Sequence, residues 1–232
     1  MNEKGISIFQ QGQLLLINKP LHWTSFDIVR KLNFLSRTKV GHAGTLDPLA
    51  TGLLICCTGK WTKNLQKYQG MVKEYTGTIT LGAVTPTFDL ESSPEQFRET
   101  ASISLEHVVS AAETLTGAQQ QVPPVHSALK RQGSPSYKLA RQGLEITPDP
   151  RTITIYNFQI ISFQNPQVHF RVECSTGTYI RSLAHDFGGL LGCGGYLSKL
   201  CRTRIGEYSL DQALEIDVAE LMIRKLRQAQ KG

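Results

Sequence analysis

Residues 41–54 carry one carboxylate, Asp47, in a loop whose backbone is restricted by glycine and proline. The segment reads GHAGTLDPLATGLL, so the apolar residues Leu46 and Leu49 lie close to the carboxylate. A carboxylate with a fixed direction and limited access to water suits a nucleophile or a general base. The alternative, which a generic Asp-Pro pair favours, is an Asx-turn in which Asp47 only begins a turn at Pro48. The segment matches neither of the two glycine-rich phosphate-binding patterns.

Apolar and alternating segments predict the elements that must position this loop. Strands are expected at 14–17, 53–57, 75–81, 152–163 and 168–174. Helices are expected at 25–34, with Ser25 as its cap, and at 63–68, 104–115, 179–191 and from 217 onward. Strand-helix-strand units are few, so the pattern predicts an α+β fold with a mixed, largely antiparallel sheet flanked by helices.

Two connecting segments have a distinct composition. Residues 84–101 are acidic, contain two prolines and show little periodicity, so we expect a mobile surface loop. Residues 121–150 are rich in proline and in basic side chains, which predicts a basic excursion with a short helix near 137–142.

Composition excludes several classes of protein. The 232 residues are 40% hydrophobic, enough for a core in one large domain or two small ones. No window approaches the roughly 18 apolar residues that a membrane span needs. The N-terminus lacks a signal pattern, so we expect a cytoplasmic protein. The five cysteines form neither a disulfide framework nor a zinc-binding C-x-x-C pair, and we expect reduced, mostly buried thiols.

The net charge of +6 is unevenly distributed. Residues 84–113 hold six acidic side chains and one arginine, so that segment carries −5 and the rest of the chain +11. A basic remainder can present a basic face to nucleic acid. Scattered lysines that keep the protein in solution explain the charge equally well.

Several motifs, in order from about residue 13 to residue 206, resemble the TruB family of tRNA pseudouridine synthases. The family's signature loop reads very like GHAGTLDPLATGLL. The other matching segments are Asn18-Lys19-Pro20 with Thr24-Ser25, Lys73-Glu74-Tyr75, Gln121-Val122-Pro123-Pro124, Ser127-Ala128-Leu129-Lys130, Tyr137 with Ala140-Arg141-Gln142-Gly143, Ser175 to Arg181, and Leu200-Cys201-Arg202-Thr203.

The resemblance implies an isomerase with a pseudouridine-synthase catalytic fold that converts uridine 55 in the T-loop of tRNA to pseudouridine. The uridine would be flipped out of the stack, with Asp47 as the catalytic residue. The reaction breaks the N1–C1′ bond, turns the uracil and joins C5 to C1′. Because no atom is gained or lost, we expect no cofactor and no metal. Asp47 either adds to the uracil ring or assists at C1′, and the sequence leaves both open.

The resemblance also implies roles around that aspartate. Arg181 would pair with Asp47 and hold it ionised and oriented. Tyr75 would stack on the extruded uracil, with its hydroxyl placed to help move the C5 proton. His42 would occupy the space that the flipped base leaves. The ordinary explanations are a surface arginine, a half-buried strand tyrosine and a surface histidine.

Three further residues would complete the uracil site. Tyr179 and Leu200 would line the uracil pocket, although plain core packing also explains both. Lys19 would contact phosphate or support the Asp47 loop; alternatively it is a solvated turn lysine.

Residues 124–151 match the family's thumb-like insertion, which folds over the RNA loop. Its basic side chains with Tyr137 among them give the combination of charge and stacking that RNA binding needs. The basic residues are Lys130, Arg131, Lys138, Arg141 and Arg151. The alternative is a disordered surface loop, and both interpretations hold if the segment orders on binding RNA.

The chain departs from the family pattern at a few points. His22-Trp23 stands where a glycine-containing turn is more common, Ala43 where threonine is common, and Pro86 where an acid is usual. About 26 residues follow Gly206, too few for the small C-terminal RNA-binding (PUA) domain of bacterial members. We therefore expect one catalytic domain over 1–232, with 207–232 as a helical tail.

The resulting prediction is a monomeric enzyme that acts on the T-arm stem-loop of tRNA, with no membrane partner. Two alternatives remain open. The same isomerisation could act on another RNA, because the pocket reads uracil while the surrounding surface selects the RNA. An RNA-binding module that has lost catalysis is the second, although Asp47, Tyr75 and Arg181 are all present.

Overall fold

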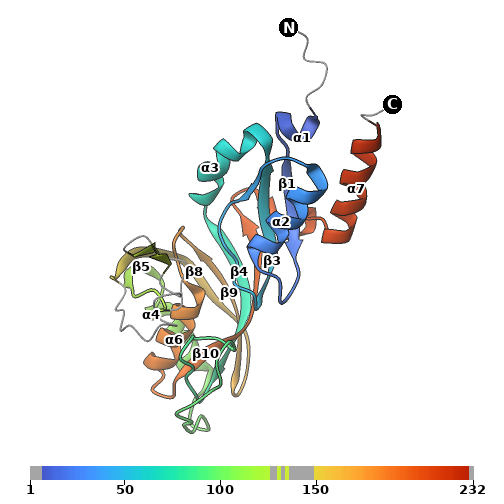
Figure 1. Ribbon diagram of the computed structural model, residues 1–232. Coiled ribbons are helices and arrows are strands. Elements are labelled where there is room, and N and C mark those ends of the chain that lie inside the picture. Colours follow the sequence, from blue (N-terminus) through green and yellow to red (C-terminus); the bar gives the residue numbers. More distant parts are fainter. Residues whose placement is uncertain (1–6, 126–129, 132–133, 136–148, 230–232) are drawn as a thin grey trace. The chain divides into compact units, whose positions relative to one another are not determined.

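The computed structural model describes residues 7–125, 130–131, 134–135 and 149–229 (Figure 1). The chain divides into two compact units, which we call unit 1 (residues 1–75 and 201–232) and unit 2 (residues 76–200). Strands β4 (Lys73–Leu81) and β10 (Gly195–Ile205) each contribute residues to both units. Within the described ranges, no helix is long and apolar enough to cross a membrane.

Unit 1 is built on strand β3 (Ala50–Thr58), which follows the loop that carries Asp47. Strand β1 (Leu14–Lys19) pairs with it antiparallel, and the register sets Lys19 opposite Gly52. Strand β2 (Val40–His42) also pairs with β3 and leads into that loop. The remaining elements are α1 (Ile8–Gln11), α2 (Ser25–Ser36), η1 (Gly59–Asn64), α3 (Leu65–Gln69), β11 (Tyr208–Ser209), η2 (Leu210–Gln212) and α7 (Ile216–Ala229).

The sheet of unit 1 buries both of its faces, because alternate side chains of β3 enter two different clusters. Leu54 and Cys56 pack with Leu32 of α2 and Ile223 of α7 on one face. On the other face, Leu53, Ile55 and Cys57 pack with Tyr68 and Ile205. A strand that is covered on both sides is a rigid base for the loop that precedes it.

Unit 2 is built on strands β8 (Arg151–Gln164) and β9 (Gln167–Cys174), which form a long antiparallel pair. Strand β5 (Gly117–Gln121) extends the sheet on the other side of β8. The ring of Phe158 packs against two others: its centroid lies 5.7 Å from that of Phe170 and 5.6 Å from that of Phe187. The helices are α4 (Leu105–Thr114) and α6 (Ile180–Leu190), and β6 (Lys130–Arg131) pairs with β7 (Ser134–Pro135) as a separate ribbon.

The predicted α+β class and the largely antiparallel pairing are confirmed. All five predicted strands and the helices around residues 25, 104, 179 and 217 are present, with ends shifted by a few residues. Among the strands that were not predicted, β5 and β10 are the longest; glutamines fill β5 and basic residues interrupt β10. All five cysteines are reduced thiols and four are buried, as expected. The predicted helix at 137–142 lies outside the described residues.

Candidate active site

The Asp47 loop, which we define as residues 43–50, is tied at both ends to its own backbone and to β3. Ala43 N donates to Ile55 O at 2.9 Å, and Ala50 N donates to Asp47 O at 3.0 Å. Ala43, Leu46 and Ala50 are buried, while Asp47 itself is half-buried. Buried residues thus anchor the loop on both sides of the half-buried carboxylate.

Ser25 holds the centre of the Asp47 loop. Its buried Oγ accepts a hydrogen bond from Leu46 N at 2.8 Å and donates one to Leu46 O at 3.1 Å. The prediction that Ser25 caps α2 is therefore wrong. Thr24 is the cap, and its hydroxyl accepts from Asp27 N at 3.0 Å while the Asp27 carboxylate accepts from Thr24 N at 3.0 Å. Because Thr24 satisfies the helix end, the Ser25 hydroxyl can bind the loop.

Lys19 supports the same loop from the end of β1. Its side chain is completely buried, and Nζ donates to Trp23 O at 2.6 Å, Pro20 O at 3.0 Å and Pro48 O at 3.5 Å. Burial lowers the pKa of Lys19 to about 8, and the nearby Asp47 carboxylate partly offsets that effect. Of the two roles implied for Lys19, these contacts favour support of the loop.

Arg202 on β10 braces the loop from another strand. It is 1% exposed, and Nε donates to Leu53 O at 2.8 Å while Nη2 donates to Gly44 O at 3.1 Å. Its backbone also explains Gly52, which has φ +104° and where a Cβ would approach Arg202 O to 2.4 Å. The sequence analysis did not assign this role to Arg202, because the residue stood out there only as part of the motif at 200–203.

His42 and Tyr75 belong to unit 1 together with Asp47 and Lys19. His42 is half-buried at the end of β2, and burial lowers its pKa, so the ring is neutral near pH 7. Tyr75 is 7% exposed in β4, which makes it more deeply buried than the half-buried strand tyrosine of the simpler interpretation.

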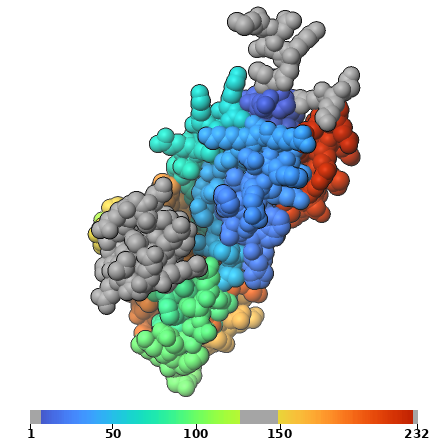
Figure 2. All heavy atoms as spheres, in the orientation of Figure 1, coloured from blue at the N-terminus to red at the C-terminus, as the bar shows by residue number. Residues whose placement is uncertain are grey.

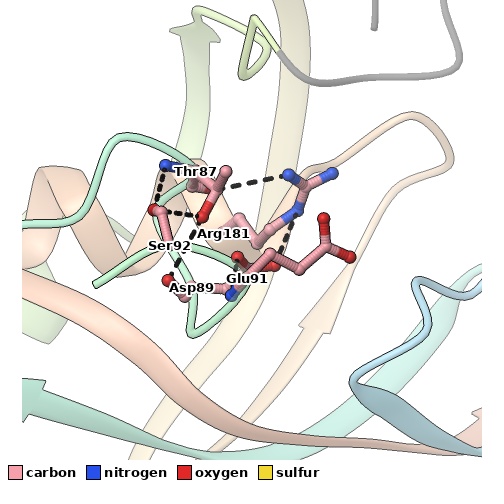
Figure 3. Close-up of polar contacts among 5 residues, drawn as sticks. All are labelled: Thr87, Asp89, Glu91, Ser92 and Arg181. Atoms are coloured by element: carbon pink, nitrogen blue, oxygen red, sulfur yellow. Dashed lines mark hydrogen bonds and ion pairs between the residues drawn. The ribbon is translucent and has the colours of Figure 1, made fainter. Parts of the chain in front are cut away.

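Arg181 lies in the first turn of α6, in unit 2, and forms a buried polar cluster (Figure 3). Its Nη1 donates to Thr87 O at 3.3 Å, and its Nε lies 3.7 Å from Asp89 Oδ2. The side chains of Arg181 and Asp89 are 6% and 5% exposed. Asp89 Oδ1 also accepts from Glu91 N at 3.0 Å. The arginine is therefore a buried cation rather than a surface one.

The prediction of a surface loop at 84–101 is confirmed for its second half, where residues 95–99 are exposed, whereas the first half is anchored in this cluster. Thr85, Thr87 and Asp89 are all buried, and Val84 pairs with Glu95 in a short antiparallel bridge. The Ser92 hydroxyl ties the segment together by accepting from Thr87 N at 3.1 Å. The acidic and proline-rich composition gave no indication that Asp89 forms an ion pair with Arg181, some ninety residues away in the chain.

Tyr179 is positioned through its backbone. Gln121 Oε1 accepts from Tyr179 N at 2.8 Å, and Gln121 Nε2 donates to Tyr179 O at 3.0 Å. The guanidinium of Arg151 lies 5.5 Å from the centre of the Tyr179 ring. Gln121 is 2% exposed, so its amide is committed to this one residue. Leu200 is half-buried in β10.

The predicted site residues thus divide between the two units. Lys19, His42, Asp47 and Tyr75 belong to unit 1, whereas Tyr179, Arg181 and Leu200 belong to unit 2, and the pairing of Asp47 with Arg181 stays a prediction. Lys130 lies in β6, and Arg141 lies outside the described residues. Among the residues that the structure describes, no group of three or more His, Cys, Asp or Glu side chains could hold a metal ion.

Comparison with known proteins identifies the family. The model of the TruB family pseudouridylate synthase N-terminal domain matches residues 31–180. The tRNA pseudouridine synthase B of Flavobacterium johnsoniae is 46% identical over 220 residues, which are 91% of this chain and 96% of that protein. The tRNA pseudouridine synthase B of Parabacteroides distasonis is 46% identical over 219 residues, 90% of this chain and 93% of that protein.

Solved structures agree on the fold. The crystal structure of a Cbf5-Nop10-Gar1 complex contains a chain that is 27% identical, with a TM-score of 0.69 over 90% of this chain and 54% of that one. The structure of an H/ACA RNP bound to a substrate RNA containing 2′-deoxyuridine gives a TM-score of 0.71 at 22% identity over 99% of this chain and 61% of that one, a likeness in fold alone. On the family model and the two close relatives, the chain belongs to the TruB family of pseudouridylate synthases.

Proposed function

We propose that this protein is an isomerase that converts uridine 55 in the T-loop of tRNA to pseudouridine, with Asp47 as the catalytic residue. The observation that carries the proposal is the support of the Asp47 loop by Ser25, Lys19 and Arg202. This is the preorganisation that a catalytic carboxylate requires. The two tRNA pseudouridine synthases B with 46% identity over nearly their full lengths support the same activity.

The reaction is an intramolecular rearrangement, so the chain's own residues would supply what it needs. The target uridine flips out of the RNA stack, and Asp47 then acts on the uracil ring or at C1′. Tyr75 stacks on the uracil, and His42, neutral near pH 7, fills the place the base has left. Neither a cofactor nor a metal enters this scheme.

Residues of unit 2 complete the proposed site. Arg181 pairs with and orients Asp47, and Tyr179 and Leu200 line the uracil pocket. The burial of Arg181 supports its role, since Thr87 and Asp89 hold the guanidinium in one orientation. The two hydrogen bonds from Gln121 to the Tyr179 backbone likewise support a fixed ring.

We further propose that residues 1–232 form one catalytic domain that works as a monomer in the cytoplasm. Residues 124–151, with Lys130 and Arg141, contact the RNA, and residues 207–232 form a tail that includes α7. The net charge of +6 supports a polyanionic partner. The T-arm stem-loop is the proposed recognition unit, because a flipped-base pocket reads a loop and a few stem pairs.

Incubation with unmodified tRNA, followed by chemical mapping of pseudouridine, tests the function. We expect a single modified position, uridine 55. Pseudouridine only in other RNAs would redirect the proposal to another substrate, and binding without any pseudouridine would replace it with a non-catalytic RNA-binding role.

A separate comparison tests the T-arm as the recognition unit. We expect kcat/KM for an isolated T-arm stem-loop to lie within about tenfold, or ~1.4 kcal/mol, of the value for full tRNA. A larger loss would show that contacts beyond the T-arm carry much of the recognition.

A further inference from the structure

Helix α2 exposes two aromatic rings to solvent. Phe26 and Phe34 are 68% and 75% exposed, whereas Ile28, Leu32 and Leu35 of the same helix are buried. Both rings therefore lie off the buried face of the helix. Their spacing of eight residues, with Arg30 midway, instead sets the three side chains along one stripe of the helix surface.

A pocket of about 520 Å³ lies beside Phe34. It lies entirely within unit 1 and is lined by His22, Trp23, Asp27, Arg30, Lys31 and Phe34. A second hollow of about 320 Å³ also includes Phe34 and is lined by Arg37, Arg224 and Arg227 as well as Asn33 and Leu35. In the space-filling view, the blue atoms of the chain range that contains α2 lie at the surface, with the red range of α7 beside them (Figure 2).

The charge around Phe34 is positive. Arg30 lies 3.3 Å from Asp27, and both Lys31 and Arg224 contact Glu220, at 2.5 Å and 2.6 Å. Two carboxylates are thus shared among these three cations, while Arg37 and Arg227 add further positive charge. The side chain of Arg30 is 74% exposed, so it can turn toward an incoming anion.

The pocket adjoins the Asp47 loop. His22 N donates to Pro48 O at 2.8 Å, and Trp23 O accepts from Lys19 Nζ at 2.6 Å. His22 and Trp23 are also where the sequence departs from the family's usual turn. His22 adopts φ +66°, the left-handed conformation that glycine takes more readily. Two large rings next to the Asp47 loop therefore line the pocket together with Phe34, and His22 does so at a conformational cost.

From these observations we propose that this pocket binds an unpaired nucleotide of the substrate RNA, distinct from the target uridine. The base stacks on Phe34 and the phosphate contacts Arg30. An exposed ring beside an exposed guanidinium is the combination that binds single-stranded RNA, and the volume suits one nucleotide. The identification of the ligand as RNA rests on the proposed function.

Two variants with matched controls test the proposal. Phe34→Ala and Arg30→Ala are compared with Phe97→Ala, whose ring is 78% exposed in unit 2, and with Arg171→Ala, an exposed arginine of β9. Binding of a T-arm stem-loop is measured at several salt concentrations. We expect Phe34→Ala to raise Kd at least about fivefold, because stacking on that ring is lost. Arg30→Ala should lower the salt slope by about one, and both controls should match the wild type.

A fluorescence signal tests contact directly. The chain has two tryptophans, Trp23 and Trp61, so Trp61→Phe leaves Trp23 as the only reporter. We expect saturating RNA to quench that fluorescence in the Trp61→Phe protein, and to quench it much less when Phe34→Ala is added. Thermal melting of every variant shows whether the fold is retained.

The outcomes separate this inference from the proposed function. If the wild type makes pseudouridine but Phe34→Ala and Arg30→Ala bind RNA as the wild type does, the pocket proposal is wrong and the proposed function stands. If the wild type makes no pseudouridine in any RNA tested, the proposed function fails. The same comparison of Kd values still shows whether the pocket binds RNA. The variants could instead leave RNA binding unchanged while Phe34→Ala abolishes binding of a protein partner. That result would show that the pocket binds protein and not RNA.

Discussion

Replacing Ser25 by alanine should loosen the loop that carries Asp47. The change removes the two hydrogen bonds between Ser25 Oγ and the backbone of Leu46, each worth about 1 kcal/mol net. It also leaves the Leu46 N–H without that partner at a position that is 3% exposed, which costs about 1–3 kcal/mol if no other group replaces it. Because that cost of 1–3 kcal/mol takes the place of the net value of the N–H bond, and only the bond to Leu46 O adds about 1 kcal/mol, we expect the free energy of unfolding to fall by about 2–4 kcal/mol.

Ser36 provides a matched control on the same helix. Ser25 and Ser36 are 2% and 3% exposed, but the Ser36 hydroxyl has no hydrogen-bond partner among the described residues. Ser36→Ala makes the same chemical change and gives the same small gain in helix propensity without breaking a hydrogen bond. Its free energy of unfolding should therefore stay within about 0.5 kcal/mol of the wild type or rise slightly.

Urea unfolding and single-turnover kinetics on tRNA measure the two effects. We expect Ser25→Ala to form pseudouridine at least about tenfold more slowly than the wild type at saturating enzyme, because small displacements of a catalytic group cost large factors in rate. Ser36→Ala should keep the wild-type rate. Equal stabilities for the two variants would refute the argument from hydrogen bonds. A destabilised Ser25→Ala with a full rate would show that Leu46 does not position the carboxylate.

Three further changes probe other parts of the site. Burial lowers the pKa of Lys19 to about 8, so kcat/KM should fall as pH rises from 8 to 9 and the loop loses its cation, and Lys19→Arg should abolish that fall. Over pH 8 to 10.5, Lys19 is still protonated in the unfolded chain but has lost its proton in the folded chain. The contribution of Lys19 to the free energy of unfolding should therefore rise with pH over this range. Urea titrations of the wild type and of Lys19→Met at several pH values measure that rise. Arg181→Lys should lower the single-turnover rate far more than RNA affinity, because lysine lacks the fork that spans Thr87 O and Asp89; an unchanged rate would exclude a role in orientation. Neutralising Lys130, Arg131, Lys138 and Arg141 together should flatten the salt dependence of tRNA binding by roughly one unit for each lost phosphate contact, and an unaltered slope would remove 124–151 from the interface.

The sequence allowed much of the fold to be predicted where periodicity was strong. The apolar runs of β1 and β3 and the alternation in β4, β8 and β9 all correspond to observed strands. Strand β10 escaped prediction because Lys199, Arg202 and Arg204 interrupt its apolar pattern. One of these basic residues, Arg202, is completely enclosed and bonds to loop carbonyls, which no local pattern reveals.

The candidate site could be predicted only as far as local motifs reached. Asp47 stood out because glycine and proline frame it, but the residues that brace its loop come from distant parts of the chain. Ser25 has the side chain of a helix cap, and only the tertiary structure shows that Thr24 takes that role. Asp89 lies in an acidic stretch typical of a surface loop, yet it is buried against Arg181. Such pairings depend on long-range contacts that composition and spacing do not encode.

The central claim is that Asp47 performs the isomerisation, and one comparison tests it most directly. Wild type and Asp47→Asn are each incubated in excess with unmodified tRNA, and pseudouridine at position 55 is followed through a single turnover. The substitution keeps the shape of the side chain and removes only the anionic oxygen. We expect wild-type melting and tRNA affinity in Asp47→Asn, with no pseudouridine formed. Pseudouridine at a rate comparable to that of the wild type would contradict the assignment of Asp47.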